Sequence, residues 1–171
     1  DYFNKNISNI KAMLWPIKQI KIFTENSYNK EILKFEDQKD NLFSILQNQK
    51  IFDQLTTELI KNKFFKSKKN IKFDSLSYNL IINCDARNEM TKKFFSKKFE
   101  KKYNSIAFTT IIDHKKLSLN NEAIQVFTND GPIAFLPISK EKTSIVYSAR
   151  MKKNKTELEI NKIINKFNPK Y

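Results

Sequence analysis

The chain has 171 residues, of which 40% are hydrophobic and 15 are Phe, a composition typical of a folded domain or a large piece of one. Its single cysteine, histidine and glycine exclude an internal disulfide, a structural zinc site of about four ligands, a G-x-G-x-x-G dinucleotide motif and a phosphate-binding loop. The net charge of +14 leaves three interpretations open: nucleic-acid binding, attraction to an anionic membrane, and a lysine-rich composition without a function.

The first half of the chain is predicted to form short strands and one helix. Apolar patterns predict strands at residues 18–24, 32–36, 71–73 and 78–84. A short apolar run at 42–46 leads into a helix predicted over 48–62, because Phe52, Leu55 and Leu59 recur at helical spacing. The strand at 78–84 is continuously apolar at its centre, which predicts that both of its faces are covered.

The second half is predicted to contain more strand. A short helix is expected at 88–95, and the strands that follow it are expected at residues 105–112, 122–128, 133–138 and 143–149. Their close spacing implies an antiparallel meander. Thr156 and Glu159 form a capping box that opens a helix ending near Phe167, before Pro169. We expect this helix to have nothing to pack on, as in an internal fragment of a longer protein.

The segment from Leu80 to Asn88 is a candidate ligand site. A buried strand is predicted to end at Asp85, and a helix begins shortly after it. In open α/β sheets, ligands bind beyond the carboxyl ends of strands, where a carboxylate accepts hydrogen bonds from a ribose and a helix N-terminus holds a phosphate. The alternative, that Asp85 or Asn88 only caps the helix, stays open.

A second candidate site lies in the strands on either side of Gly131. Gln125 and Phe127 share one face of their predicted strand and offer a polar group beside an aromatic wall. A Gly131-Pro132 turn is predicted to join this strand to the next, in which Pro137 removes a donor from the ladder, as at an edge, a bulge or the approach of a ligand. The alternative is an ordinary hairpin with Phe127 in the core and Gln125 in solvent.

Taken in chain order, these segments resemble a known family, the ubiquinone-biosynthesis hydroxylases. The resemblance rests on the D-x-x-N stretch at 85–88, Tyr103-Asn104-Ser105-Ile106-Ala107, the Q-x-F strand, the G-P-x-A-x-L-P strand at 131–137, Ser144-Ile145-Val146-Tyr147-Ser148 and, near the start, Trp15-Pro16-Ile17. The family belongs to the class A flavoprotein monooxygenases, which include para-hydroxybenzoate hydroxylase. The resemblance covers nearly the whole chain, and its order and spacing are more specific than any one motif.

The resemblance implies an α+β or α/β fold with a mixed, largely antiparallel substrate-domain sheet, helices and part of an FAD-domain sheet. The implied fold is an incomplete FAD/NAD(P)-binding flavoprotein fold. Residues 42–95 would belong to the FAD domain, residues 1–41 and 100–150 would supply substrate-domain strands, and residues 155–167 would form a helix.

The resemblance also implies two groups of site residues. The cofactor-binding group is Asp85, Asn88, Asn48 and Pro137. The substrate-side group is Gln125, Phe127 and Leu136. For Asn48, the alternative role of a helix cap stays open. No catalytic acid or base is implied, and His114, which lies among lysines, is predicted to be a surface residue.

The implied parent enzyme binds FAD, takes electrons from NAD(P)H and uses molecular oxygen to hydroxylate the ring of a polyprenylated phenol. Three positions depart from the family's pattern, with Ala86 for its usual Gly, Glu89 for its usual Ser and Lys92 for its usual Arg. The family's N-terminal G-x-G-x-x-G unit and C-terminal G-D motif are absent, and we expect both to lie outside this chain. The isolated chain is therefore expected to be inactive and not to retain flavin.

Two alternatives to the hydroxylase stay open. One is a basic binding module without chemistry, which docks on nucleic acid or on an anionic membrane; the hydroxylase interpretation expects no nucleic-acid partner. The other is a related flavoprotein reductase, such as a geranylgeranyl reductase. No apolar run approaches the roughly 18 residues that span a bilayer, and no secretory leader is visible. We expect a cytoplasmic protein, or one in peripheral contact with the inner membrane face.

Overall fold

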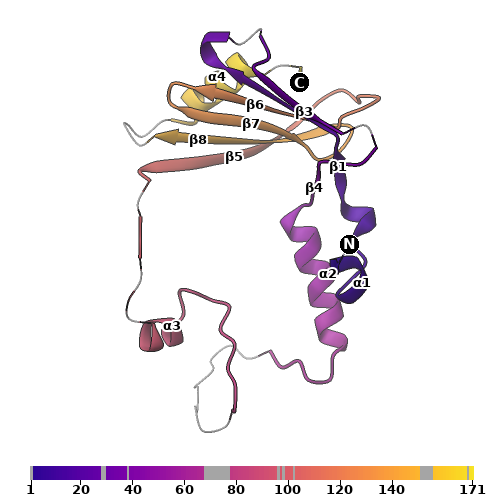
Figure 1. Cartoon of the computed structure of the whole chain (residues 1–171), viewed down its shortest axis with the longest axis vertical. Helices are drawn as coiled ribbons and strands as arrows, with labels where there is room; N and C mark the ends of the chain where they lie inside the picture. Colours follow the sequence, from indigo (N-terminus) through magenta and orange to yellow (C-terminus); the bar gives the residue numbers. More distant parts are fainter. Residues whose placement is uncertain are drawn as a thin grey trace. The chain divides into compact units, whose positions relative to one another are not determined.

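The computed structural model describes residues 2–27, 30–37, 39–67, 78–95, 97, 99–101, 103–150, 156–168 and 170–171. The chain divides into two compact units (Figure 1). Unit 1 contains Asp1–Asn62 and Asn104–Tyr171, and unit 2 contains Lys63–Tyr103. The assignment of residues 42–95 to an FAD domain stays a prediction, and the first part of this range belongs to unit 1.

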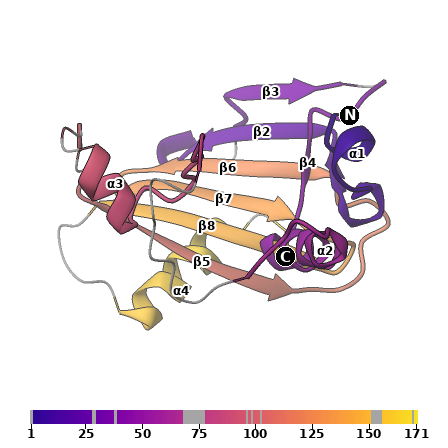
Figure 2. The same cartoon turned by 90° about the horizontal axis from the view of Figure 1, so that it is seen from below.

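Unit 1 is built on a six-stranded sheet with the strand order β3-β2-β6-β7-β8-β5, which Figure 2 shows from below. Its strands are β2 (Gln19–Thr24), β3 (Leu33–Glu36), β5 (Ser105–Asp113), β6 (Glu122–Thr128), β7 (Gly131–Pro137) and β8 (Lys142–Arg150). Strands β2 and β6 are parallel, and every other neighbouring pair is antiparallel. The predicted mixed α+β class with a largely antiparallel sheet is confirmed.

One face of this sheet forms the hydrophobic core together with helix α4 (Glu157–Phe167). The buried residues of β6, β7 and β8 in this core are Ile124, Val126, Ile133, Phe135, Ile145, Tyr147 and Ala149. Ile164 and Phe167 of α4 pack against them, and the predicted capping box of Thr156 and Glu159 is present. The expectation that this helix has nothing to pack on is wrong, because strands β6, β7 and β8 supply its partner surface.

The predicted meander is correct for three of its four strands. Strands β6, β7 and β8 follow one another as antiparallel neighbours, but β5 lies beside β8 and not beside β6. The loop after β5 carries the chain across the end of the sheet, where His114 N donates to Glu141 O and Leu117 N donates to Lys140 O. These bonds extend the long β5–β8 ladder and place β5 at the edge.

The N-terminal part of unit 1 adds a small second sheet and short helices. Strands β1 (Trp15–Ile17) and β4 (Phe43–Ile45) pair antiparallel. The helical elements are α1 (Tyr2–Asn6), α2 (Asn48–Lys61) and the 3₁₀ turns η1 (Lys11–Met13) and η2 (Glu25–Ser27). The helix predicted over 48–62 is therefore confirmed. It buries no residue fully, and Gln54 Nε2 donates to Ser8 Oγ over 2.9 Å.

Unit 2 contains one short helix, α3 (Glu89–Phe94), among its described residues. The predicted strand at 78–84 is wrong, because this segment has no regular structure. Leu80 and Ile82 are 77% and 79% exposed, so the predicted cover on both faces is absent as well. A strand needs a hydrogen-bonded neighbour, and no described segment of unit 2 pairs with this one. The predicted strand at 71–73 lies outside the described residues.

Candidate functional site

The three residues predicted on the substrate side share one face of the six-stranded sheet. Gln125 pairs with Ala134, and Leu136 lies two residues further along β7. Because side chains alternate along a strand, Gln125, Phe127 and Leu136 all lie opposite the face that packs on α4. We call this side the open face. Phe127 is 46% exposed there, whereas Gln125 and Leu136 are partly buried.

The open face is largely apolar. By register with Gln125, its other members include Ile20, Ile22, Leu33, Phe35, Ala134 and Val146. The Gln125 amide, which can both donate and accept a hydrogen bond, lies among these apolar side chains. This arrangement suits a flat aromatic group with one polar substituent.

Pro137 does not belong to the open face. It follows Leu136, it pairs with Thr143 of β8, and it is fully buried. By the alternation along β7, its ring lies on the same side as Phe135, which faces α4. Pro137 therefore lies on the opposite side from the open face, and its contact with FAD stays a prediction.

Asp85 and Asn88 lie in unit 2, where their side chains are bound locally. Asp85 is exposed, and its Oδ1 accepts a hydrogen bond from Arg87 N over 2.9 Å. Asn88 is the N-cap of α3, and its Oδ1 accepts a hydrogen bond from Thr91 N over 2.9 Å. The Asn88 amide also exchanges hydrogen bonds with the amide of Asn83. The helix-cap alternative is correct for Asn88, and contact of either residue with FAD stays a prediction.

Asn48 does not cap α2. It is the first residue of that helix and is exposed, while Gln47 occupies the N-cap position without a side-chain cap bond. The helix-cap alternative for Asn48 is thus wrong, and its predicted contact with FAD stays a prediction.

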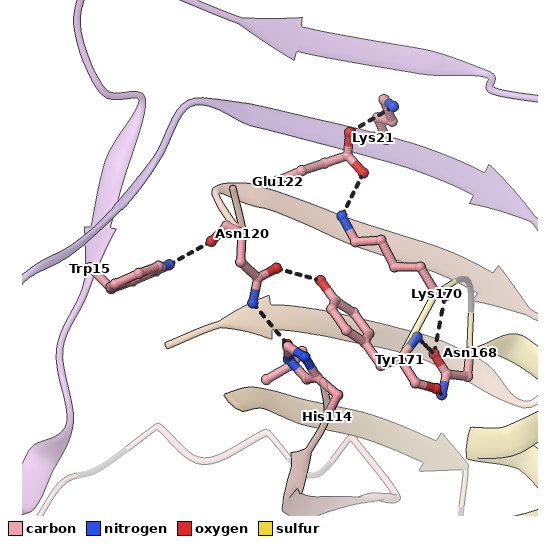
Figure 3. A network of polar contacts seen from close by, with 9 residues as sticks. Trp15, Lys21, His114, Asn120, Glu122, Asn168, Lys170 and Tyr171 are labelled. Atoms are coloured by element: carbon pink, nitrogen blue, oxygen red, sulfur yellow. Dashed lines mark hydrogen bonds and ion pairs between the residues drawn. The ribbon is translucent and has the colours of Figure 1, made fainter. Parts of the chain in front are cut away.

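A polar network that the sequence did not predict is centred on Asn120 (Figure 3). Asn120 is 2% exposed, and both polar atoms of its side chain have hydrogen-bond partners. Its backbone O accepts a hydrogen bond from Trp15 Nε1 over 2.6 Å, and its Oδ1 accepts one from the Tyr171 hydroxyl over 3.0 Å. Its Nδ2 donates to Ser139 O over 2.8 Å. The network therefore ties β1 and the segment around Tyr171 to the loops at one end of the sheet.

His114 extends this network and is not a surface residue as predicted. It is partly buried, with its Nε2 3.1 Å from Thr143 Oγ1 and its Nδ1 2.9 Å from Lys115 O. Its ring lies 4.7 Å from the ring of Tyr171. Burial raises the pKa of Tyr171 to about 12, and its hydroxyl donates to Asn120 Oδ1. These contacts join His114 and Tyr171 to the network around Asn120, which we call the Asn120 clamp.

Glu122 joins three segments beside this network. Lys21 Nζ of β2 lies 2.6 Å from Glu122 Oε2, and Lys170 Nζ lies 3.2 Å from Glu122 Oε1. Burial by itself would raise the pKa of Glu122. The hydrogen bond from Lys21 and the charge of Lys170 outweigh that effect, so the pKa of this carboxyl is lowered.

No local pattern in the sequence could have identified this clamp. Trp15 and Asn120 are 105 positions apart, and Asn120 and Tyr171 are 51 apart. The only available signal is the polar pair Asn120-Asn121 directly before a strand, which is equally typical of a surface turn.

Across the described ranges, no group of three or more His, Cys, Asp or Glu side chains is placed to hold a metal ion. Nor does any helix in the part of the chain that the structure describes have the length and apolarity to cross a membrane. In comparisons with known proteins, the sequence matches no family model and no curated protein.

Proposed function

We propose that this chain supplies the substrate-side part of an FAD-dependent monooxygenase that hydroxylates the aromatic ring of a polyprenylated phenol in ubiquinone biosynthesis. The chain-order resemblance described above motivates the proposal. The observation that carries it is the placement of Gln125, Phe127 and Leu136 on one apolar face of the sheet. Each of the three comes from a segment on which the resemblance rests.

The residues of this chain fit one part of FAD and not another. The open face suits a flat ring, because the side chains next to the Gln125 amide are apolar, while Thr24, Ser144 and Ser148 lie farther along the same face. The Asp85 loop does not suit the pyrophosphate, for two reasons. Asn88 Oδ1 already accepts a hydrogen bond from Thr91 N, so that N–H is not available to a phosphate. Ala86 also occupies the position at which the family has Gly. A cavity of about 330 Å³ lies beside the Asp85 loop. Its lining is mainly apolar, with side chains such as Tyr78, Leu80 and Phe94, and this lining does not suit a pyrophosphate either.

The division of labour follows from these side chains. When bound, FAD supplies the oxygen chemistry with electrons from NAD(P)H. Phe127 and Leu136 would form the apolar wall that orients the substrate ring and excludes water. The Gln125 amide would hold the phenol hydroxyl by a hydrogen bond and so fix which ring carbon faces the cofactor.

One test reads the coding sequence on both sides of this chain. We expect a G-x-G-x-x-G segment before it and a G-D segment after it, because its single glycine can supply neither motif. Flanks that lack both motifs would contradict the proposal.

A second test uses the protein with these flanking segments. It is expected to purify with bound flavin and to form a hydroxylated product from a polyprenylated phenol, while the 171-residue chain alone loses flavin on gel filtration. Phe127→Ala and Gln125→Leu should each slow hydroxylation about tenfold or more, with the flavin still bound. Phe52→Ala is the matched control, because Phe52 is exposed on α2.

Three outcomes would contradict the proposal. Reduction of a prenyl double bond without hydroxylation would favour a reductase. Tight binding of nucleic acid that falls steeply with salt, by a protein without flavin, would favour a basic binding module. Stoichiometric flavin bound by the isolated 171-residue chain would show that the cofactor site was wrongly assigned.

A further inference from the structure

Strand β3 forms one edge of the six-stranded sheet. Among the described residues, it pairs only with β2, so its outer side has no strand partner. All four of its residues are exposed, and Leu33 and Phe35 are each 46% exposed. Many edge strands carry a proline or a bulge that blocks further pairing. Between Leu33 and Glu36 strand β3 has neither, because its register against β2 runs without interruption there. The pairing is irregular only just before the strand, where Ile32 N donates to Ile22 O, the partner of Leu33.

The hydrogen-bond pattern determines which backbone groups of β3 point outward. On the inner side, Asp37 N donates to Lys18 O over 3.2 Å, and this bond continues the register of the Leu33–Glu36 ladder. The bond from Ile32 N to Ile22 O lies outside that register. The N–H and C=O groups of successive residues point to opposite sides of a strand. Those of Phe35 therefore point toward β2, and those of Lys34 and Glu36 point outward. The outer edge thus presents one donor and one acceptor from each of these two charged residues.

We propose that two copies of this chain associate through their β3 strands, paired antiparallel about Phe35. In this register, Lys34 of each copy lies opposite Glu36 of the other, so two ion pairs form across the interface. The outward backbone groups of Lys34 and Glu36 then meet as hydrogen-bonded pairs, and Phe35 meets Phe35 of the second copy where side chains come closest. The contact is isologous and closes as a dimer.

Two copies of a strongly basic chain repel each other, but the charges near β3 are nearly balanced and permit this contact. Residues 30–40 contain three lysines and four acidic residues, namely Lys30, Lys34, Lys39, Glu31, Glu36, Asp37 and Asp40. This segment therefore has a net charge of −1, in a chain whose net charge is +14. Within one copy, Lys34 already forms an ion pair with Glu36. Dimerisation exchanges the partners of these charges without leaving any of them unpaired.

The test measures association by sedimentation equilibrium over a wide range of protein concentration. The interface is small, so we expect a weak, concentration-dependent dimer of the natural chain. K34E places acidic side chains opposite each other, and E36K places basic ones opposite each other. Each variant alone is expected to dimerise about tenfold more weakly or worse. An equimolar mixture of the two should associate again, because every opposed pair in the mixed dimer has opposite charges.

Controls separate the edge contact from changes in net charge and in folding. E58K and K61E make the same charge changes at the exposed ion pair on α2, and neither should alter association. Thermal unfolding establishes that each variant is folded. A monomeric natural chain at every concentration would overturn the proposal, as would a mixture of K34E and E36K that stays monomeric. The proposal does not depend on the hydroxylase assignment.

Discussion

Gly131 is the only glycine in the chain, and its surroundings explain why glycine is needed there. Its φ is +140°, in a region that side-chain-bearing residues rarely adopt. A Cβ at this position would lie 1.9 Å from the backbone O of Ser148. Because the obstructing atom belongs to the backbone of β8, it cannot move away as the end of a flexible side chain could.

Replacing this glycine should therefore destabilise the sheet strongly. We expect Gly131→Ala to lower the free energy of unfolding by about 3 kcal/mol or more, measured by urea denaturation. Ser148→Ala is the control, since it keeps the carbonyl group and alters only the side chain on the open face. A cost below about 1 kcal/mol for Gly131→Ala would show that the two strands separate easily.

The sequence revealed part of this residue-scale detail. It marked Gly131-Pro132 as a turn, but the structure places the turn at Asn129 and Asp130 and begins β7 at Gly131. The placement of Gln125 and Phe127 on the same face could be predicted from the sequence, because it depends only on the two-residue period of a strand. The contacts of Asn120 could not be predicted from the sequence, because the residues that make them come together only in the fold.

Helix α4 shows what a sequence pattern can and cannot predict for an element. Thr156 and Glu159 marked its start, and the helical spacing of Ile160, Ile163, Ile164 and Phe167 matches the side that packs on the core. The pattern did not show the partner surface, which is made by strands β6, β7 and β8. The segment at 78–84 shows the reverse, since an apolar run was taken for a strand although no described neighbour pairs with it.

The packing of α4 can be tested at its most buried aromatic residue. Phe167 is 4% exposed in the core, and we expect Phe167→Ala to lower the free energy of unfolding by about 3–5 kcal/mol. Leu158→Ala on the same helix is the matched control, because Leu158 is 65% exposed and its loss should cost less than about 0.5 kcal/mol. Equal effects of the two substitutions, measured by chemical denaturation, would contradict the packing of α4 on the sheet.

At the scale of the whole molecule, Glu122 links β2, β6 and the segment around Lys170. Its pKa in the folded chain is below the ordinary value of 4.5. A carboxyl with a lowered folded pKa stabilises the fold fully above its ordinary pKa, and it loses that contribution as the pH falls through the folded pKa. The ion pairs of Glu122 should therefore weaken only in acid.

Glu122→Gln tests this dependence. The difference in free energy of unfolding between the natural chain and E122Q should be constant from neutral pH down to about 4.5 and should shrink at lower pH. Urea denaturation at a series of pH values measures it. Glu58→Gln is the control on an exposed ion pair and should show a much smaller difference. A difference for E122Q that does not change with pH would show that its charge is not coupled to folding.

The overall class of the molecule could be predicted, whereas its strand order could not. Local patterns located most strands of the sheet, but they carried no information on the parallel pairing of β2 with β6 or on the edge position of β5. These pairings depend on the energy of contacts between distant segments, which a single sequence does not display.

The parallel pairing of β2 with β6 has a consequence for synthesis on the ribosome. Gln19 of β2 is translated early, but it pairs with Glu122 of β6. The hairpin of β2 and β3 therefore cannot pair with β6 until about a hundred further residues have been translated. Unit 2 emerges during that interval. The sheet is therefore completed late, because the long loop between β2 and β6 must close first. Contacts between residues so far apart in sequence are typical of slowly folding chains.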